Sequence, residues 1–129
     1  SLNAAILAPD VNVDDAEFDL FVREVFKEMT TKVGQKCTAI RRIIVPGHIM
    51  PQVCDKLIQR LAKVSYGDPD SDGVRMGALA SLEQLNDVKA KIIALSENCE
   101  LIYSQETKAV GIGCDKGAFI APHLVLLQP

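Results

Sequence analysis

Residues 34–39 read GQKCTA, and they separate two stretches with different patterns. The preceding segment is amphipathic with helical spacing, whereas residues 40–45 read IRRIIV, a β-rich run that Pro46 ends. This order predicts a helix, a short turn and a strand. Cys37 lies at the corner, where regular structure on both sides fixes the chain while the sulfur can still face a cleft. Such a position suits a thiolate nucleophile, although a cysteine at any one position can equally be a small buried hydrophobe.

The chain before this corner predicts a strand and a helix. Residues 3–7 read NAAIL, a short apolar run typical of buried parallel strands. From residue 16 onward, charged side chains face away from an apolar stripe at helical spacing, which consists of Phe18, Val22, Val25 and Met29. Asp14 or Asp15 can cap this helix, and Gly34 can end it in a left-handed turn.

Beyond the corner, the pattern predicts two more helices. One of them has Pro51 in its first turn, where proline is favourable. The other starts at Ser81, which forms a capping-box pattern with Gln84. The expected buried stripe of this last helix consists of Leu85, Val88, Ile92 and Leu95.

Extended segments complete the pattern at residues 100–103 and 119–127. Strands that alternate with helices predict an α/β fold of three layers, in which helices flank a largely parallel sheet. The sequence shows no internal repeat, low-complexity tract or linker. We therefore expect a single domain over residues 1–129.

Composition argues against several kinds of partner. The 129 residues are 48% hydrophobic, and 14 basic and 17 acidic side chains give a formal net charge of −3. Without a block of basic residues, nucleic-acid binding is not expected. No apolar stretch approaches the roughly 20 residues of a membrane span, and the amino terminus lacks a signal-peptide pattern. We expect a cytoplasmic protein.

The four cysteines, Cys37, Cys54, Cys99 and Cys114, are widely and irregularly spaced. A structural zinc site usually shows close ligand pairs, and a disulfide framework usually belongs to a small secreted chain. Neither pattern occurs here. The sequence therefore predicts separate thiols in a reducing compartment and no metal site.

Two loops resemble ligand motifs but lack an essential feature. Residues 68–73 read DPDSDG, like the start of a calcium-binding EF-hand loop, but the twelfth position is Leu79 where a bidentate glutamate is needed. Gly111 and Gly113 form a Gly-x-Gly pattern, yet no helical stripe follows it, as a phosphate-binding loop would require. We expect both segments to be connectors.

The sequence of residues 34–45 resembles the active-site segment of the aldehyde dehydrogenase superfamily. That segment reads Gly-Gln-x-Cys at the nucleophile, and a small residue, a basic residue and a buried strand follow. Within this superfamily, the chain resembles the dehydrogenase half of the bifunctional ring-cleavage enzymes of phenylacetate catabolism. Further matches run the whole length of the chain: SLNAA at 1–5, GDP at 67–69, GVRMGAL at 73–79 and FIAP at 119–122.

The resemblance implies a fragment of an aldehyde dehydrogenase catalytic domain that forms a thioester. Cys37 would be the nucleophile, and its backbone N–H would stand in the oxyanion hole. The resemblance also implies NADP or NAD as cofactor, a CoA-linked semialdehyde as substrate and a homo-oligomeric enzyme. The family's general base, oxyanion asparagine and cofactor-binding domain match nothing in this chain, and we assign none of these roles to Glu17 or Glu24. The chain alone is expected to be inactive and to self-associate.

Two other classes of function remain open from the residues. One is a thiol-redox or binding module that works through Cys37, although no resolving cysteine lies near it in the sequence. The other is a non-catalytic α/β interaction domain in which all four cysteines are packing residues. The accessibility of the thiols distinguishes these readings, because an inert domain reacts slowly at every cysteine.

Overall fold

The computed structural model describes residues 2–105 and 107–127. The chain divides into two compact units, residues 1–63 and 64–129, and each is described here by itself. The single domain over residues 1–129 stays a prediction.

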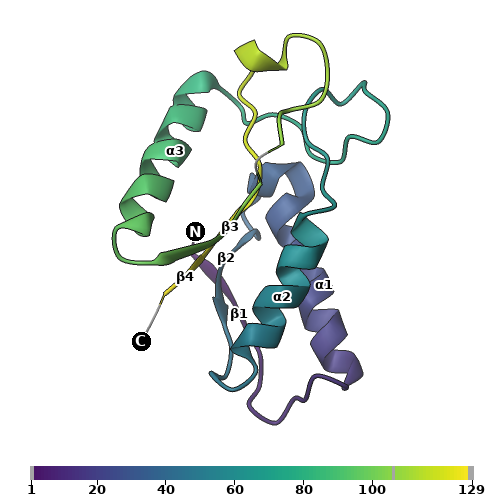
Figure 1. Ribbon diagram of the computed structural model, residues 1–129, viewed down its shortest axis with the longest axis vertical. Helices are drawn as coiled ribbons and strands as arrows, with labels where there is room; N and C mark the ends of the chain where they lie inside the picture. Colours follow the sequence, from purple (N-terminus) through teal and green to yellow (C-terminus); the bar gives the residue numbers. More distant parts are fainter. Residues whose placement is uncertain (1, 106, 128–129) are drawn as a thin grey trace. The chain divides into compact units, whose positions relative to one another are not determined.

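The first unit contains a parallel pair of strands, β1 (Asn3–Ile6) and β2 (Ile40–Ile44), which lie side by side in Figure 1. Ala4 pairs with Arg42, and Ile6 pairs with Ile44. The register shifts between Asn3 and Ala4, because Asn3 pairs with Ile40 and the next pair skips one residue of β2. Such a bulge bends a strand and redirects its side chains. Here it lies at the start of β2, just after the GQKCTA stretch.

Two helices complete this unit, α1 (Ala16–Thr30) and α2 (Met50–Leu61). Helix α1 contacts both β2 and α2. The apolar stripe of α1 is buried as predicted at three of its positions, and it meets the stripe of α2 in a core of Phe18, Val22, Val25, Val53, Leu57 and Leu61. Asp15 is the residue before the first turn of α1, but its carboxylate accepts a hydrogen bond from the Asn12 N–H at 2.7 Å instead of capping the helix.

Helix α1 ends in a short helical turn, η1 (Thr31–Gly34), with an unusual backbone. Lys32 (φ 52°), Val33 (φ 58°) and Gly34 (φ 68°) all adopt left-handed angles. The predicted left-handed glycine is confirmed, and the left-handed conformation extends over the two residues before it. A non-glycine residue pays about 1–2 kcal/mol for this conformation, so surrounding contacts must hold the segment in place.

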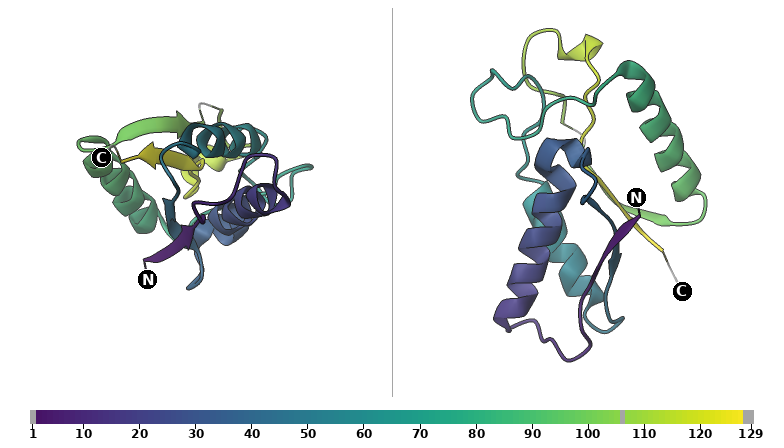
Figure 2. Two further views of the ribbon diagram at one scale, coloured as in Figure 1. Left: turned by 90° about the horizontal axis from the view of Figure 1, so that it is seen from below. Right: turned by 180° about the vertical axis from the view of Figure 1, so that it is seen from behind.

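The second unit contains α3 (Leu82–Ser96) and an antiparallel pair, β3 (Glu100–Ser104) and β4 (His123–Leu126). The left view of Figure 2 shows the two strands next to each other, and α3 contacts β4. The capping residue was predicted correctly, since the Ser81 hydroxyl accepts the Gln84 N–H at 3.1 Å. A short 3₁₀ turn, η2 (Cys114–Lys116), precedes β4.

Close backbone contacts hold the loops of this unit. The backbones of Tyr66 and Met76 form an isolated parallel β-bridge, and those of Gly67 and Val110 form another. The hydroxyl of Tyr66 donates to the carbonyl of Thr107 at 2.6 Å. Burial raises the pKa of this phenol, because it disfavours the charged form.

The predicted α/β class is confirmed, with helices and a small parallel sheet. The described strands form one parallel and one antiparallel pair rather than one continuous sheet. The predicted buried stripe of α3 is confirmed at Leu85 alone: Val88 and Ile92 are intermediate in exposure, and Leu95 is 50% exposed. Within the described residues, no helix is both long and apolar enough to cross a membrane.

Candidate active site

Cys37 lies in a tight turn between η1 and β2. The Ala39 N–H donates to the Lys36 carbonyl at 3.2 Å, which closes a four-residue turn with Cys37 in its second position. The side chain of Cys37 is exposed, whereas Ala39 is fully buried and anchors the end of the turn. Cys37 is thus an exposed residue in a turn, at the corner position that the sequence predicted.

The side chain of Asn3 holds this turn from β1. Its amide nitrogen donates to the Cys37 carbonyl at 2.6 Å and to the Ala39 carbonyl at 3.2 Å. Both partners are carbonyl oxygens, so only the nitrogen of the amide can face them. A single side chain therefore fixes two peptide groups of the turn.

An ion pair connects the turn to α1. The Lys36 ammonium lies 2.7 Å from a carboxylate oxygen of Glu28, and the two side chains are only 22% and 20% exposed. The other carboxylate oxygen of Glu28 is buried and has no hydrogen-bond partner among the described residues. The positive charge next to Cys37 is thus engaged by an acid from the helix.

A third contact reaches the turn from the bulged end of β2. The guanidinium of Arg41 donates to the Gly34 carbonyl at 2.9 Å, and Arg42 donates to the Leu2 carbonyl. The first contact joins the end of η1 to β2, and the second joins β2 to the residue before β1. Strained backbone persists only where its surroundings over-determine it, and it often occurs at functional sites.

The sequence did not reveal that Asn3, Glu28 and Arg41 hold this segment, because each contacts a residue that is distant in the chain. Asn3 is 34 residues from Cys37. Its one available signal was a polar amide at the start of an apolar strand. Glu28 stands on the polar side of an amphipathic helix, where a charged residue is usually solvated.

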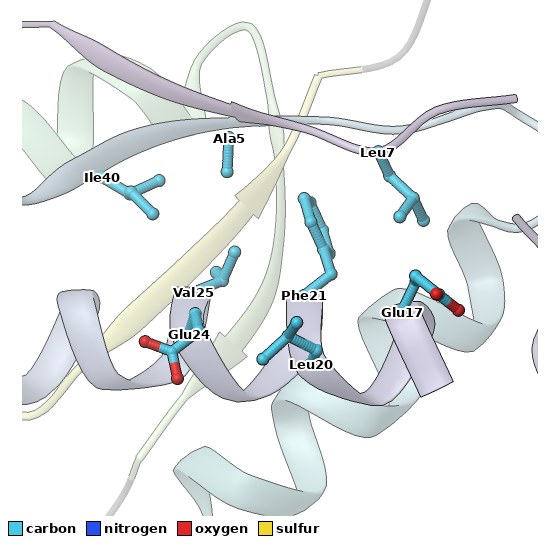
Figure 3. A pocket seen from close by; sticks show the side chains of 8 residues that line it. All are labelled: Ala5, Leu7, Glu17, Leu20, Phe21, Glu24, Val25 and Ile40. Carbon is cyan, nitrogen blue, oxygen red and sulfur yellow. The ribbon is translucent and has the colours of Figure 1, made fainter. Parts of the chain in front are cut away.

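An open apolar groove of about 270 Å³ lies between the sheet and α1 in the first unit (Figure 3). Ala5 of β1 and Leu7, just after β1, point toward the helix, and Phe21 points back from α1. Cys37 is not among its lining residues, which are Ala5, Leu7, Glu17, Leu20, Phe21, Glu24, Val25 and Ile40. The groove therefore does not extend to the thiol.

We assign the role of general base to neither carboxylate along this groove. Glu24 is paired with Arg23 at 3.4 Å and with Lys27 at 3.6 Å. Glu17 stands in the first turn of α1, where the helix dipole favours its negative charge. Neither residue is brought to Cys37 by a described contact.

The remaining cysteines are less accessible than Cys37. Cys114 is buried, and its thiol donates to the Val110 carbonyl at 3.1 Å. Cys54 and Cys99 are intermediate in exposure. Burial raises the pKa of the Cys54 thiol, and the neighbouring Asp55 carboxylate raises it further. This environment lowers the thiolate fraction of Cys54 at neutral pH.

The two ligand-like loops serve as connectors. In the loop at residues 68–73, the Asp68 carboxylate accepts the Asp70 N–H at 3.0 Å, a local turn. Gly111 permits a close approach, because a side chain there would meet Asp68 at 2.5 Å. The three-residue turn after Gly113 is too short to form a phosphate-binding helix terminus. Among the described residues, no group of three or more His, Cys, Asp or Glu residues could hold a metal ion.

Iodoacetamide is expected to label the folded chain first at Cys37 and last at Cys114. The exposed thiol needs no opening, whereas the buried one needs local unfolding, so their rate constants should differ by about ten-fold or more. Quenched labelling followed by peptide mass spectrometry measures each thiol separately. In concentrated urea the four rates should converge. Uniformly slow labelling of the folded chain would instead support an inert domain.

Comparison with known proteins places this arrangement in a family. The model of the aldehyde dehydrogenase family matches residues 3–128. The chain belongs to the aldehyde dehydrogenase family. A curated member, 3,4-dehydroadipyl-CoA semialdehyde dehydrogenase of Aromatoleum evansii, is 39% identical over 127 residues, which are 97% of this chain and 25% of that protein. The chain thus spans about a quarter of the length of this relative.

Solved structures show the same fold. An aldehyde dehydrogenase C of Pseudomonas syringae, a cysteine-to-alanine mutant in complex with NAD+ and octanal, aligns with a TM-score of 0.75 at 25% identity. That alignment covers 97% of this chain and 24% of the other. A betaine aldehyde dehydrogenase of Staphylococcus aureus, in complex with NAD+, aligns with a TM-score of 0.75 at 24% identity, over 95% of this chain and 24% of that one.

Proposed function

We propose that the chain carries the nucleophile of an NAD(P)-dependent aldehyde dehydrogenase, in which an aldehyde is oxidised to its acid through a thioester on Cys37. The observation that carries this proposal is an exposed Cys37 in a segment held by the side chains of Asn3, Glu28 and Arg41. The chain that contains it belongs to the aldehyde dehydrogenase family. A thiol suits the reaction because it attacks carbonyl carbon well and its thioester is still easily hydrolysed.

The first step requires a thiolate and a donor for the developing oxyanion. The Cys37 sulfur attacks the carbonyl carbon, and a C–S bond forms as the carbonyl π electrons move to oxygen. The Cys37 N–H belongs to the same residue as the sulfur, so it can donate to that oxygen in the tetrahedral thiohemiacetal. The turn contributes here by holding the backbone of Cys37, and with it the N–H and the Cα–Cβ bond that carries the sulfur.

The later steps draw on groups that this chain does not supply. The nicotinamide of NADP or NAD accepts hydride in such reactions, and the described residues offer no dinucleotide fingerprint to hold it. Water then cleaves the acyl thioester on Cys37, which needs a general base. We leave the base unassigned, and we propose that the chain alone does not turn over.

The substrate that we propose is a CoA-linked semialdehyde of phenylacetate catabolism. The support is the 39% identity to a 3,4-dehydroadipyl-CoA semialdehyde dehydrogenase and the GQKCTAIRR wording of residues 34–42. For the whole enzyme we further propose NADP as the preferred cofactor, a homo-oligomeric state and a cytoplasmic location.

Acid quenching of the full-length enzyme during turnover tests the proposal. With a semialdehyde and NADP present, the peptide that contains Cys37 should gain the mass of the acyl group. Hydroxylamine should remove that mass, because it cleaves thioesters. The sample without cofactor is the control, and it should show no acyl group after the quench. An acyl group on another residue, or none during steady turnover, would sink the assignment of Cys37.

A further inference from the structure

The amide of Asn3 is the contact that acts most directly on the reactive residue. It stands at the start of β1 and reaches across to the turn that precedes β2. The hydrogen bond to the Cys37 carbonyl, at 2.6 Å, is the shorter of its two contacts with the turn. The other contacts described above act on Gly34, which precedes the turn, and on Lys36, its first residue.

This contact fixes the backbone rotation at Cys37. A β-turn leaves the carbonyl of its second residue without a partner inside the turn. Asn3 supplies that partner, and through Ala39 it holds the next part of the same turn. With the carbonyl held, rotation about the Cα–C bond of Cys37 is restricted, and its N–H and Cα–Cβ bonds keep one orientation relative to β1.

The bulge in the sheet keeps Asn3 at this position. Asn3 pairs with Ile40 and Ala4 pairs with Arg42, so Arg41 is the extra residue of β2. The side chain of Arg41 returns to the Gly34 carbonyl on the other side of the turn. Asn3 and Arg41 thus hold opposite ends of the segment that contains Cys37.

We propose that Asn3 is a positioning residue for the nucleophile. By holding the carbonyl of Cys37, its amide orients the backbone of this residue so that the N–H of Cys37 faces the oxyanion formed by attack of the sulfur. This inference rests on the proposed function and adds a residue to it. Asn3 touches neither substrate nor cofactor in this role, because it acts through the backbone of Cys37.

Two thiol reactions with different demands test this role in the 129-residue chain. Para-nitrophenyl acetate acylates a thiolate through a tetrahedral oxyanion and releases para-nitrophenolate, whereas iodoacetamide alkylates it by displacement of iodide without an oxyanion. Both need the thiolate, so the ratio of the two rate constants at Cys37 cancels any change in thiolate fraction. Peptide mass spectrometry assigns both rates to Cys37, and the urea-unfolded chain gives the ratio without an oriented N–H.

The ratio is the rate constant for acylation by para-nitrophenyl acetate divided by that for alkylation by iodoacetamide. In the folded wild-type chain, this ratio should exceed that of the unfolded chain by about ten-fold, as expected for one well-placed donor in an open site. Asn3→Ala and Asn3→Asp should both lower it to the unfolded value. The aspartate is nearly isosteric but has no donor, so it keeps the shape of the side chain if alanine loosens the strand. Asn86→Ala, on an exposed position of α3, is the matched control and should leave the ratio unchanged.

The outcomes separate the two levels of the proposal. A purely structural Asn3 would lower the melting temperature without changing the ratio, and this result would overturn the positioning role while leaving Cys37 as nucleophile. Equal ratios in the folded and unfolded wild-type chain would overturn the oxyanion role of the Cys37 N–H, and the role of Asn3 with it. Circular dichroism confirms that each variant is folded.

Discussion

Aldehyde oxidation by the full-length enzyme should fall by about 10⁴-fold or more when Cys37 is replaced by alanine. The substitution removes the sulfur that we propose forms the thioester, so the covalent route is lost rather than slowed. Because the side chain is exposed, its truncation should change the free energy of unfolding by no more than about 0.5 kcal/mol. Steady-state NADPH formation and a urea unfolding curve measure the two effects.

Cys99→Ala is the matched control for this experiment. It removes a thiol of intermediate exposure from the other unit, at a site with no part in the proposed chemistry. Its turnover should remain within about two-fold of wild type, as for most substitutions away from a site. Substantial dehydrogenase turnover in Cys37→Ala, with Cys99→Ala unaffected, would contradict the assignment of the nucleophile.

Gly67→Ala is expected to destabilise the second unit by about 3 kcal/mol or more. An added Cβ at this position would lie 2.1 Å from the Val110 carbonyl oxygen and 2.5 Å from the Val110 nitrogen. Both atoms are backbone, and that backbone is fixed by the hydrogen bonds Asp68 N–H to Val110 O and Val110 N–H to Tyr66 O, each 2.8 Å. The positive φ of 144° at Gly67 adds strain for any side chain.

Gly47→Ala provides the comparison, because a Cβ there meets nothing within 4 Å. Urea unfolding of both variants should show a loss of stability at Gly67 alone. Protection of amides in residues 64–129 from hydrogen exchange should fall in Gly67→Ala and stay unchanged in Gly47→Ala. Wild-type stability of Gly67→Ala would show that the loops at Gly67 and Val110 do not pack as closely as described.

The helices could be predicted from the sequence because their signals are local. The spacing of Phe18, Val22 and Val25 locates the face of α1 that is buried, and Ser81 marks the start of α3. Periodicity identifies an apolar face but not how far its partner extends. This is why Leu95 was expected to be buried with Leu85 and is exposed instead.

The left-handed backbone of Lys32 and Val33 could not be predicted for a related reason. Intrinsic preference argues against this conformation at both residues, and most strongly at a β-branched valine. Contacts made after the chain has folded, from Arg41 to Gly34 and from Lys36 to Glu28, hold the segment. The antiparallel pairing of β3 with β4 likewise depends on where the chain returns, which a strand pattern does not encode.

At the candidate site, the sequence indicated Cys37 as a candidate nucleophile but not its supports. Its position at a corner and the sequence around it single it out. Asn3 became visible only when β1 and β2 were paired, because pairing brings residues from distant parts of the chain into hydrogen-bond range. Roles that depend on the base, the cofactor or the substrate involve groups outside the described contacts.

The bracing of the turn also has a consequence for recombination. The residues described as holding it all fall between Asn3 and Arg41, so fewer than forty codons encode the nucleophile together with its supports. A crossover between related genes outside this interval transfers Cys37 together with the residues that hold its turn. A crossover inside the interval can instead combine Asn3 from one parent gene with the Cys37 turn from the other. Chimeras joined after residue 45 should therefore inherit the set as a unit, and natural exchange should leave fewer surviving junctions within the interval than beyond it.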